Sequence, residues 1–210
     1  MDSGNIGFVL LCAAFVFVMT PGLAMFYGGL VRKKNVVNTM MTSIFIIGVG
    51  IVMWVLFGYS LSFAPSGNAF IGDFRWLGLE GVSLTEGYTD DASIPNMVFS
   101  AFQMMFAVIT PALITGAVAG RMKFKSIFVF TIFWSLIVYY PLAHMVWGQG
   151  GLLGADGIGA LDFAGGDVVH ISSGVSALVL CILLGKRHDY EHSIYRTVSY
   201  THLRAHETRR

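Results

Sequence analysis

One histidine lies inside an apolar segment near the end of the chain. His170 stands within residues 163–185 and follows two carboxylates, Asp162 and Asp167. If Asp162 begins a helix, His170 lies eight residues further on, ~12 Å below the surface of a ~30 Å hydrocarbon core. An ionisable side chain at that depth must face a cavity or find a partner, which makes His170 a candidate site residue. A neutral imidazole bonded to a neighbouring helix is the alternative.

The two carboxylates also have open roles. Asp162 precedes Phe163, so its side chain can accept hydrogen bonds from the first free N–H groups of the following helix, at the positive end of the helix dipole. This makes Asp162 a structural cap; the alternative is a charge that shapes the mouth of a path for a cation. Asp167 precedes His170 by three residues and could pair with it or face a vestibule, so its role stays open.

Three aromatic residues could contact a cation. Phe102 and Phe106 are four residues apart and share one face of a helix, with ~6 Å between them along the axis. Such a stripe is usually core, but at a pore it becomes a constriction that holds back hydrated ions. Trp147 ends an apolar segment as an interfacial residue, or offers a π face that attracts a cation by ~0.5 to 2 kcal/mol. His144, three residues earlier, is expected to bond locally.

Five apolar segments must position these residues. Their ranges are 6–31, 36–63, 96–120, 124–146 and 163–185. At ~1.5 Å rise per residue each is long enough to cross a ~30 Å hydrocarbon core. Helix is required there, because an unpaired backbone group costs several kcal/mol in lipid. We therefore predict an all-α membrane protein whose transmembrane domain, residues 1–187, is a five-transmembrane-helix bundle.

Composition and charge placement support this class. The chain is 55% hydrophobic and 12% charged with a formal net charge of +1, which leaves no basic field for nucleic acid. The connectors after the first, third and fifth segments hold eight basic residues: Arg32, Lys33, Lys34, Arg121, Lys123, Lys125, Lys186 and Arg187. The positive-inside rule then predicts a multi-pass protein of the cell membrane with its N-terminus outside.

Two further features concern what the chain lacks and how it ends. We find no nucleophile and base pair, no phosphate loop and no metal-ligand set, so we expect neither an enzyme nor a cofactor. Residues 188–210 are predicted to be a cytoplasmic tail. Within it, residues 198–210 read VSYTHLRAHETRR, polar and without an apolar period, and we interpret them as foreign sequence joined to the chain.

Four stretches resemble the ammonium transporter family (Amt/MEP/Rh). They are TPGLAMFYGGLVRKKNV at 20–36, FQMMFAVITPALITGA at 102–117, AHMVWGQGGLL at 143–153 and LDFAGGDVVHISSG at 161–174. The resemblance implies a homotrimer whose subunits each hold a narrow pore between two inverted five-helix repeats. An odd number of spans agrees, since a second copy would enter the membrane inverted. This chain would be the first repeat only.

The resemblance also implies roles for individual residues. Trp147 matches the aromatic wall of an outer recruitment site, Phe102 and Phe106 match the wall and gate beneath it, and Asp162 matches its supporting acid. His170 matches the first of two pore histidines. The implied function is transport of ammonium or ammonia: the cation is recruited at the outer site, deprotonated, and passed as ammonia along a hydrophobic pore with a histidine relay. A PII-type regulator is an implied partner on the cytoplasmic side.

Two other interpretations stay open. One is an ammonium sensor or regulatory membrane protein, in which occupancy of the outer site changes a cytoplasmic partner without net flux. The other is an inactive truncated fragment, because half of an inverted-repeat pore leaves the face with His170 towards lipid.

Overall fold

The computed structural model describes residues 1–65, 68–155 and 157–187. Its α-helices are α1 (Ser3–Leu30), α2 (Val36–Met53), α3 (Tyr59–Phe63), α4 (Asn96–Val118), α5 (Phe124–Trp134), α6 (Tyr140–Trp147) and α7 (Ser172–Leu184). The predicted tail, 188–210, with its proposed foreign segment 198–210, lies outside the described residues. Two short 3-10 turns also occur, Lys33–Asn35 and Leu77–Leu79.

Three π-helical turns lengthen the α-helices, and two of them join one α-helix to the next. Trp54–Gly58 connects α2 to α3, Ser135–Tyr139 connects α5 to α6, and Gly166–Ile171 leads into α7. Five helical segments are therefore long and apolar enough to cross a membrane: Ser3–Leu30, Lys33–Phe63, Asn96–Val118, Phe124–Trp147 and Gly166–Leu184. No strand occurs in the part of the chain that the structure describes. The predicted all-α bundle of five spans is confirmed.

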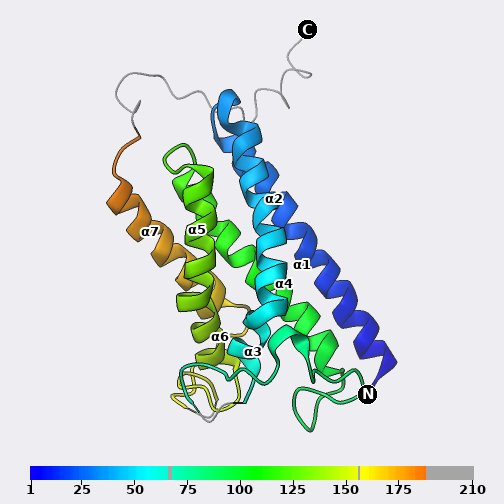
Figure 1. The fold of residues 1–210 in the computed structure, drawn as a ribbon. Coiled ribbons are helices and arrows are strands. Elements are labelled where there is room, and N and C mark those ends of the chain that lie inside the picture. Colours follow the sequence, from blue (N-terminus) through cyan, green and yellow to red (C-terminus); the bar gives the residue numbers. More distant parts are fainter. Residues whose placement is uncertain (66–67, 156, 188–210) are drawn as a thin grey trace.

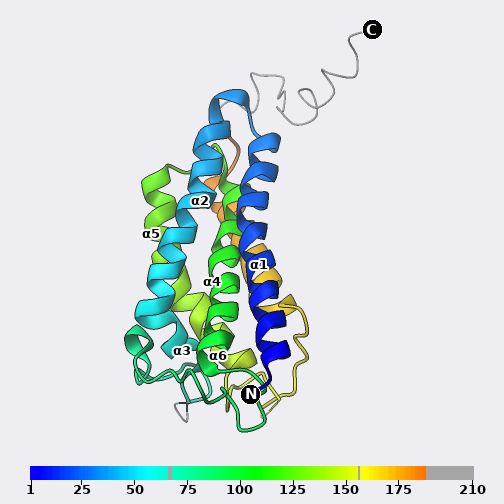
Figure 2. The same ribbon diagram turned by 90° about the vertical axis from the view of Figure 1, so that its right-hand side faces the viewer.

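The helix α4 is the centre of the bundle (Figure 2). It contacts α1, α2 and α7, and glycine allows the close approaches. A Cβ on Gly116 would lie 2.5 Å from the Tyr27 ring of α1, and one on Gly50 would lie 3.0 Å from Val108. Small residues at such crossings let membrane helices pack by van der Waals contact where lipid supplies no hydrophobic drive.

The connectors between the helices lie in two groups, one at each end of the bundle (Figure 1). The N-terminus and the long loop after α3 lie at one end, where the Asp2 N–H donates to the Ser93 carbonyl at 2.8 Å. At the opposite end the Arg121 guanidinium donates to the Gly185 carbonyl at 3.0 Å. The connectors with the basic residues follow α1, α4 and α7, so they share that second end.

An aromatic cluster fixes the long loop after α3 onto the helices. Trp54 lies 5.7 Å from Tyr59 and 6.1 Å from Tyr140, measured between ring centroids. Trp76 of the loop stacks on Tyr59 at 5.3 Å. Each such ring pair adds about 0.5–1.5 kcal/mol to the area it buries. The cluster holds the loop beside the N-terminal half of α4 and the end of α6, where the candidate site is found.

Candidate functional site

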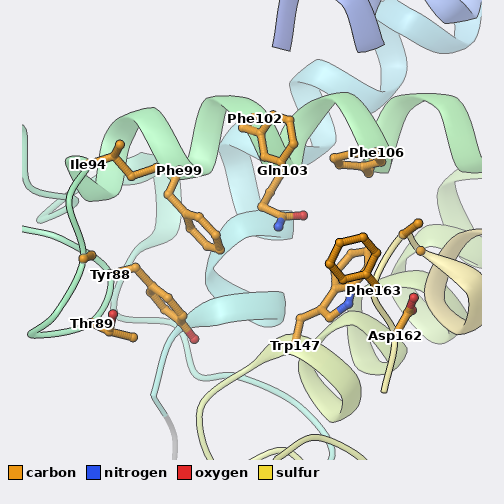
Figure 3. Close-up of a pocket in the computed structure, with 13 residues that line it drawn as sticks. Tyr88, Thr89, Ile94, Phe99, Phe102, Gln103, Phe106, Trp147, Asp162 and Phe163 are labelled. Atoms are coloured by element: carbon orange, nitrogen blue, oxygen red, sulfur yellow. The ribbon is translucent and has the colours of Figure 1, made fainter. Parts of the chain in front are cut away.

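A cavity of about 650 Å³ opens between α4, the end of α6 and the segment before α7 (Figure 3). Its walls include Tyr88, Phe99, Phe102, Gln103, Phe106, Trp147, Asp162 and Phe163. The four residues from α4 are spaced i, i+3, i+4 and i+7, so they occupy one face of that helix. The cavity brings together four of the five predicted site residues: Phe102, Phe106, Trp147 and Asp162.

The aromatic wall is a continuous series of three rings. Phe102 and Phe106 meet edge to face, with centroids 5.1 Å apart and planes at 83°. Phe106 meets Trp147 at 6.4 Å and 66°. The predicted shared face of Phe102 and Phe106 is therefore present, and it is turned towards the cavity. Rings in this arrangement exclude water and offer electron-rich faces that attract a small cation.

Asp162 caps the last helix from a loop position. The helical segment begins at Gly166, three residues later than the predicted 163, and Gly165 precedes it with a left-handed φ of 78°. The loop brings Asp162 Oδ2 to the backbone N–H groups of Asp167 and Val168, at 3.1 and 3.0 Å. Glycine is needed at the turn, because a Cβ on Gly165 would lie 2.9 Å from Val169. The carboxylate thus caps the helix while its loop lines the cavity.

The second carboxylate oxygen of Asp162 does not take part in the helix cap. Asp162 Oδ1 is buried and has no hydrogen-bond partner among the described residues. A buried acceptor left in this state costs about 1–3 kcal/mol, more for a charged group. An acceptor with free lone pairs beside three aromatic rings suits a small cation that donates hydrogen bonds.

Gln103 is a cavity residue that sequence reasoning missed. Its Oε1 is also buried without a hydrogen-bond partner among the described residues. Figure 3 shows its amide turned from α4 into the space beside Trp147 and Phe163. The available signal was an amide inside an apolar span, one residue after Phe102, because polar side chains within spans face a cavity or a partner.

His170 is the predicted site residue that the cavity does not include. It lies in the π-helical turn Gly166–Ile171 on an exposed face, next to Ile171 and near Val175, which are 57% and 55% exposed. Because the segment starts at Gly166, His170 is at most about 6 Å along its axis, not ~12 Å as the predicted start at Asp162 implied. The backbone N–H of Asp167 donates to the Asp162 carboxylate at 3.1 Å. The Asp167 side chain makes no hydrogen bond to His170 in the structure, so the predicted pairing is not seen.

His144 is buried, and its partners are distant in sequence. The residue is 0% exposed. Its Nδ1 lies 3.1 Å from the Ser62 carbonyl and its Nε2 lies 2.9 Å from the Asn68 carbonyl. The expectation of local bonding is therefore wrong, since the ring ties α6 to residues 82 and 76 positions earlier.

Tyr88 links the long loop after α3 to the segment that follows Trp147. Its hydroxyl accepts the Gln149 backbone N–H at 3.1 Å, and Gln149 Nε2 donates to its carbonyl at 3.0 Å. Its ring stacks on Phe99 at 4.9 Å with planes at 7°. Burial raises the pKa of the Tyr88 hydroxyl to about 12, although the Gln149 bond acts in the opposite direction.

We expect Tyr88→Phe to lower stability modestly, because the Gln149 N–H loses its acceptor while the stacked ring remains. The expected loss is about 1 kcal/mol, or roughly 2–4 °C in melting temperature for a chain of this size. The raised pKa means that the hydroxyl contributes stability below pH 10, and that this stability is lost as pH rises towards 12. Thermal unfolding from pH 9 to pH 12 should therefore decline less steeply in Tyr88→Phe than in the parent, and parallel profiles would contradict this assignment.

Comparisons with known proteins agree on one family. The sequence profile of the Ammonium Transporter Family matches residues 7–204. The chain is 52% identical over 203 residues to the ammonium transporter of Bacillus subtilis (strain 168), covering 97% of this chain and 49% of the relative. It is 42% identical over 215 residues to the ammonium transporter of Mycobacterium tuberculosis (strain ATCC 25618 / H37Rv), covering 93% of this chain and 45% of the relative. The chain spans about half the length of the curated relatives it matches.

Solved structures give the same answer for the fold. The crystal structure of Candida albicans Mep2 superposes with a TM-score of 0.82 at 33% identity, covering 96% of this chain and 44% of that one. Saccharomyces cerevisiae Mep2 gives 0.79 at 36% identity, covering 88% and 43%. A structure described as a Sensor Amt Protein gives 0.78 at 25% identity, covering 94% and 48%.

Proposed function

The chain belongs to the Ammonium Transporter Family, and from this premise we propose that the complete protein moves ammonium or ammonia across the cell membrane. It is a multi-pass membrane protein, with five segments able to span a bilayer. The relatives named above are ammonium transporters. One observation in this chain carries the proposal. Three aromatic rings meet, in a single cavity, a buried carboxylate oxygen that no described residue hydrogen-bonds.

In the proposed mechanism the cavity recruits the cation. Phe102 and Trp147 offer π faces, and a cation held over such a face gains about 0.5–2 kcal/mol. The Asp162 carboxylate adds a negative charge beside them. Because its Oδ2 already accepts the Asp167 and Val168 N–H groups, the group is fixed in place and Oδ1 is left for an ammonium N–H.

Passage beyond the cavity favours the neutral molecule. Burying an isolated ammonium ion in a dry apolar path would cost tens of kcal/mol on a Born estimate, whereas neutral ammonia costs far less. Ammonium therefore gives up a proton near the entrance and continues as ammonia. Phe106, between the other two rings, keeps water out, and His170 hydrogen-bonds ammonia or relays the released proton.

The exposed position of His170 points to a missing neighbour. Its face of α7 also presents Leu178, Val179 and Ile182, which are 60%, 47% and 70% exposed. We propose that a second, inverted repeat covers this face and completes the pore, that the N-terminus lies outside, and that the whole protein is a homotrimer with a PII-type regulator at its basic end. The isolated 210-residue chain is then inactive, because its half-pore opens to lipid.

The direct test is uptake of labelled ammonium or methylammonium in cells that lack other ammonium transporters. The full-length protein should give saturable uptake, and residues 1–210 expressed alone should give none. Absence of saturable uptake by a full-length protein that reaches the membrane would refute transport.

Trp147→Leu in the full-length protein is expected to raise the KM for ammonium about tenfold, because the π face is lost while an apolar residue remains. Phe133→Leu is the matched control, since Phe133 is 58% exposed on α5, away from the cavity walls. Uptake kinetics over a range of ammonium concentrations provide the measurement. An equal change in KM in both variants would mean that Trp147 contributes only its volume and not its π face.

A second candidate is an ammonium sensor, favoured by the fold similarity to the Sensor Amt Protein. A sensor binds ammonium at the same cavity without moving it. Ammonium-dependent thermal stabilisation of the full-length protein, together with absence of uptake, would favour this candidate over transport.

A further inference from the structure

We propose that Gln103 is a binding residue of the cavity, whose side-chain oxygen accepts a hydrogen bond from the ammonium ion and so raises selectivity for donors of N–H groups. This inference rests on the proposed function, because it names a further contact in the same site. It concerns a residue to which the sequence analysis assigned no role.

The position of Gln103 gives the first reason. It lies on the same face of α4 as Phe99, Phe102 and Phe106, between the two rings that border the cavity. Figure 3 shows its amide pointing away from α4, towards Trp147 and Phe163. A ligand held against the rings of Phe102 and Trp147 would therefore lie beside this amide.

The hydrogen-bond inventory gives the second reason. The Gln103 amide makes no hydrogen bond with any described residue, and its Oε1 is buried. Buried polar groups in folded proteins nearly always have a partner, so each exception asks for an explanation such as a ligand or an ordered water. Within one cavity, two such acceptors occur, Gln103 Oε1 and Asp162 Oδ1.

The chemistry of the ligand explains why both acceptors are useful. Aromatic faces attract any small cation, and this attraction does not depend on how many N–H groups the cation has. The Asp162 carboxylate likewise responds to charge. A neutral amide oxygen contributes mainly through a directed bond, so it rewards a ligand that donates N–H groups. Ammonium has four such groups, and two acceptors with two ring faces can meet them when its water is removed.

A ligand-binding residue and a structural residue make different predictions for stability. Removing an amide whose buried Oε1 has no hydrogen-bond partner should leave the empty protein equally stable or more stable, because no described residue uses that oxygen. Removing a group that supports the fold would lower the melting temperature. Sites that bind ligands commonly retain such a cost in the empty state.

The test uses Gln103→Met, which keeps the length and bulk of the side chain but removes the amide, in the full-length protein. Two quantities are measured: the KM for ammonium uptake, and the melting temperature of purified protein across a series of ammonium chloride concentrations, with sodium chloride as the control. We expect the KM, and the ammonium concentration that gives half of the thermal shift, to rise about tenfold. The melting temperature without ammonium should stay equal or rise.

Gln103→Asn is the rescue variant, because it keeps a neutral amide oxygen on the same face of α4 and should remain within about threefold of the parent KM. An unchanged KM in Gln103→Met, a fall in the melting temperature of the empty protein, or equal losses in the two variants would each overturn the inference. If the parent shows neither saturable uptake nor an ammonium-dependent thermal shift, the proposed function itself fails and this inference falls with it. If the parent shows both and only the Gln103 expectations fail, the proposed function stands.

Discussion

Asp162→Ala is expected to reduce kcat/KM for ammonium uptake by the full-length protein at least about 100-fold, equivalent to about 2.7 kcal/mol. Two contributions add. The carboxylate loses its charge-assisted bonds to the Asp167 and Val168 N–H groups, so the turn that leads into α7 is no longer fixed. The cavity also loses Oδ1, its charged acceptor. Uptake rates over a range of ammonium concentrations, at equal amounts of protein in the membrane, provide the measurement.

Asp162→Asn separates these two contributions. An asparagine oxygen can still accept the two backbone N–H groups, so the helix cap survives while the charge is removed. We expect a loss of roughly tenfold, intermediate between the parent and Asp162→Ala. If Asp162→Asn equals the parent, the carboxylate is only a cap. If it equals Asp162→Ala, the charge alone is responsible, and the cap contributes nothing to uptake.

The helices could be predicted from the sequence because lipid leaves few alternatives. A run of twenty or more apolar residues must be helical to satisfy its own backbone, and the five helical segments follow those runs closely. The π-helical turns at Trp54–Gly58, Ser135–Tyr139 and Gly166–Ile171 could not be predicted in the same way. Each admits an extra residue, so the face that follows it is rotated relative to a regular 3.6-residue period.

The candidate site was predictable where its members lie close together in sequence. Phe102 and Phe106 share a helical face at a spacing of four, and α4 presents both to the cavity. The start of the last helical segment was misplaced because Gly165 adopts a left-handed conformation that apolarity does not reveal. Asp162 therefore accepts the helix N–H groups from a position in the preceding loop, and not from the position directly before the helix.

The two histidines show that hydropathy does not reveal the surroundings of a polar side chain within a span. Both lie in spans, and the sequence alone could not say which has a protein partner. His144 meets two carbonyl groups more than seventy residues earlier in the chain, a contact that depends on how α3 and the loop after it pack against α6. His170 has an exposed side chain, and only the proposed second repeat would give it a partner.

This contrast leads to opposite expectations for two alanine substitutions. His144→Ala should be strongly destabilising, because it removes the ring N–H that donates to the Ser62 or the Asn68 carbonyl, depending on the tautomer, and opens a cavity at a fully buried site. The expected cost is about 2–4 kcal/mol, or roughly 4–16 °C in melting temperature. His170→Ala should leave the melting temperature of the full-length protein within about 2 °C if the imidazole faces a pore, since a pore-lining ring supports no packing.

For the rate of ammonium uptake we expect the opposite order, with the larger effect from the His170 substitution. His170→Ala is expected to lower the rate of ammonium uptake at least tenfold, because the dry path loses its hydrogen-bonding group for ammonia and for the released proton. His144→Ala should lower uptake only in proportion to the loss of folded protein, so the rate per folded molecule stays near that of the parent. Melting curves and uptake, both normalised to folded protein in the membrane, test the pair. Unchanged uptake in His170→Ala would remove the relay role, and a large loss of stability there would place the imidazole in a solid helix contact with no passage beside it.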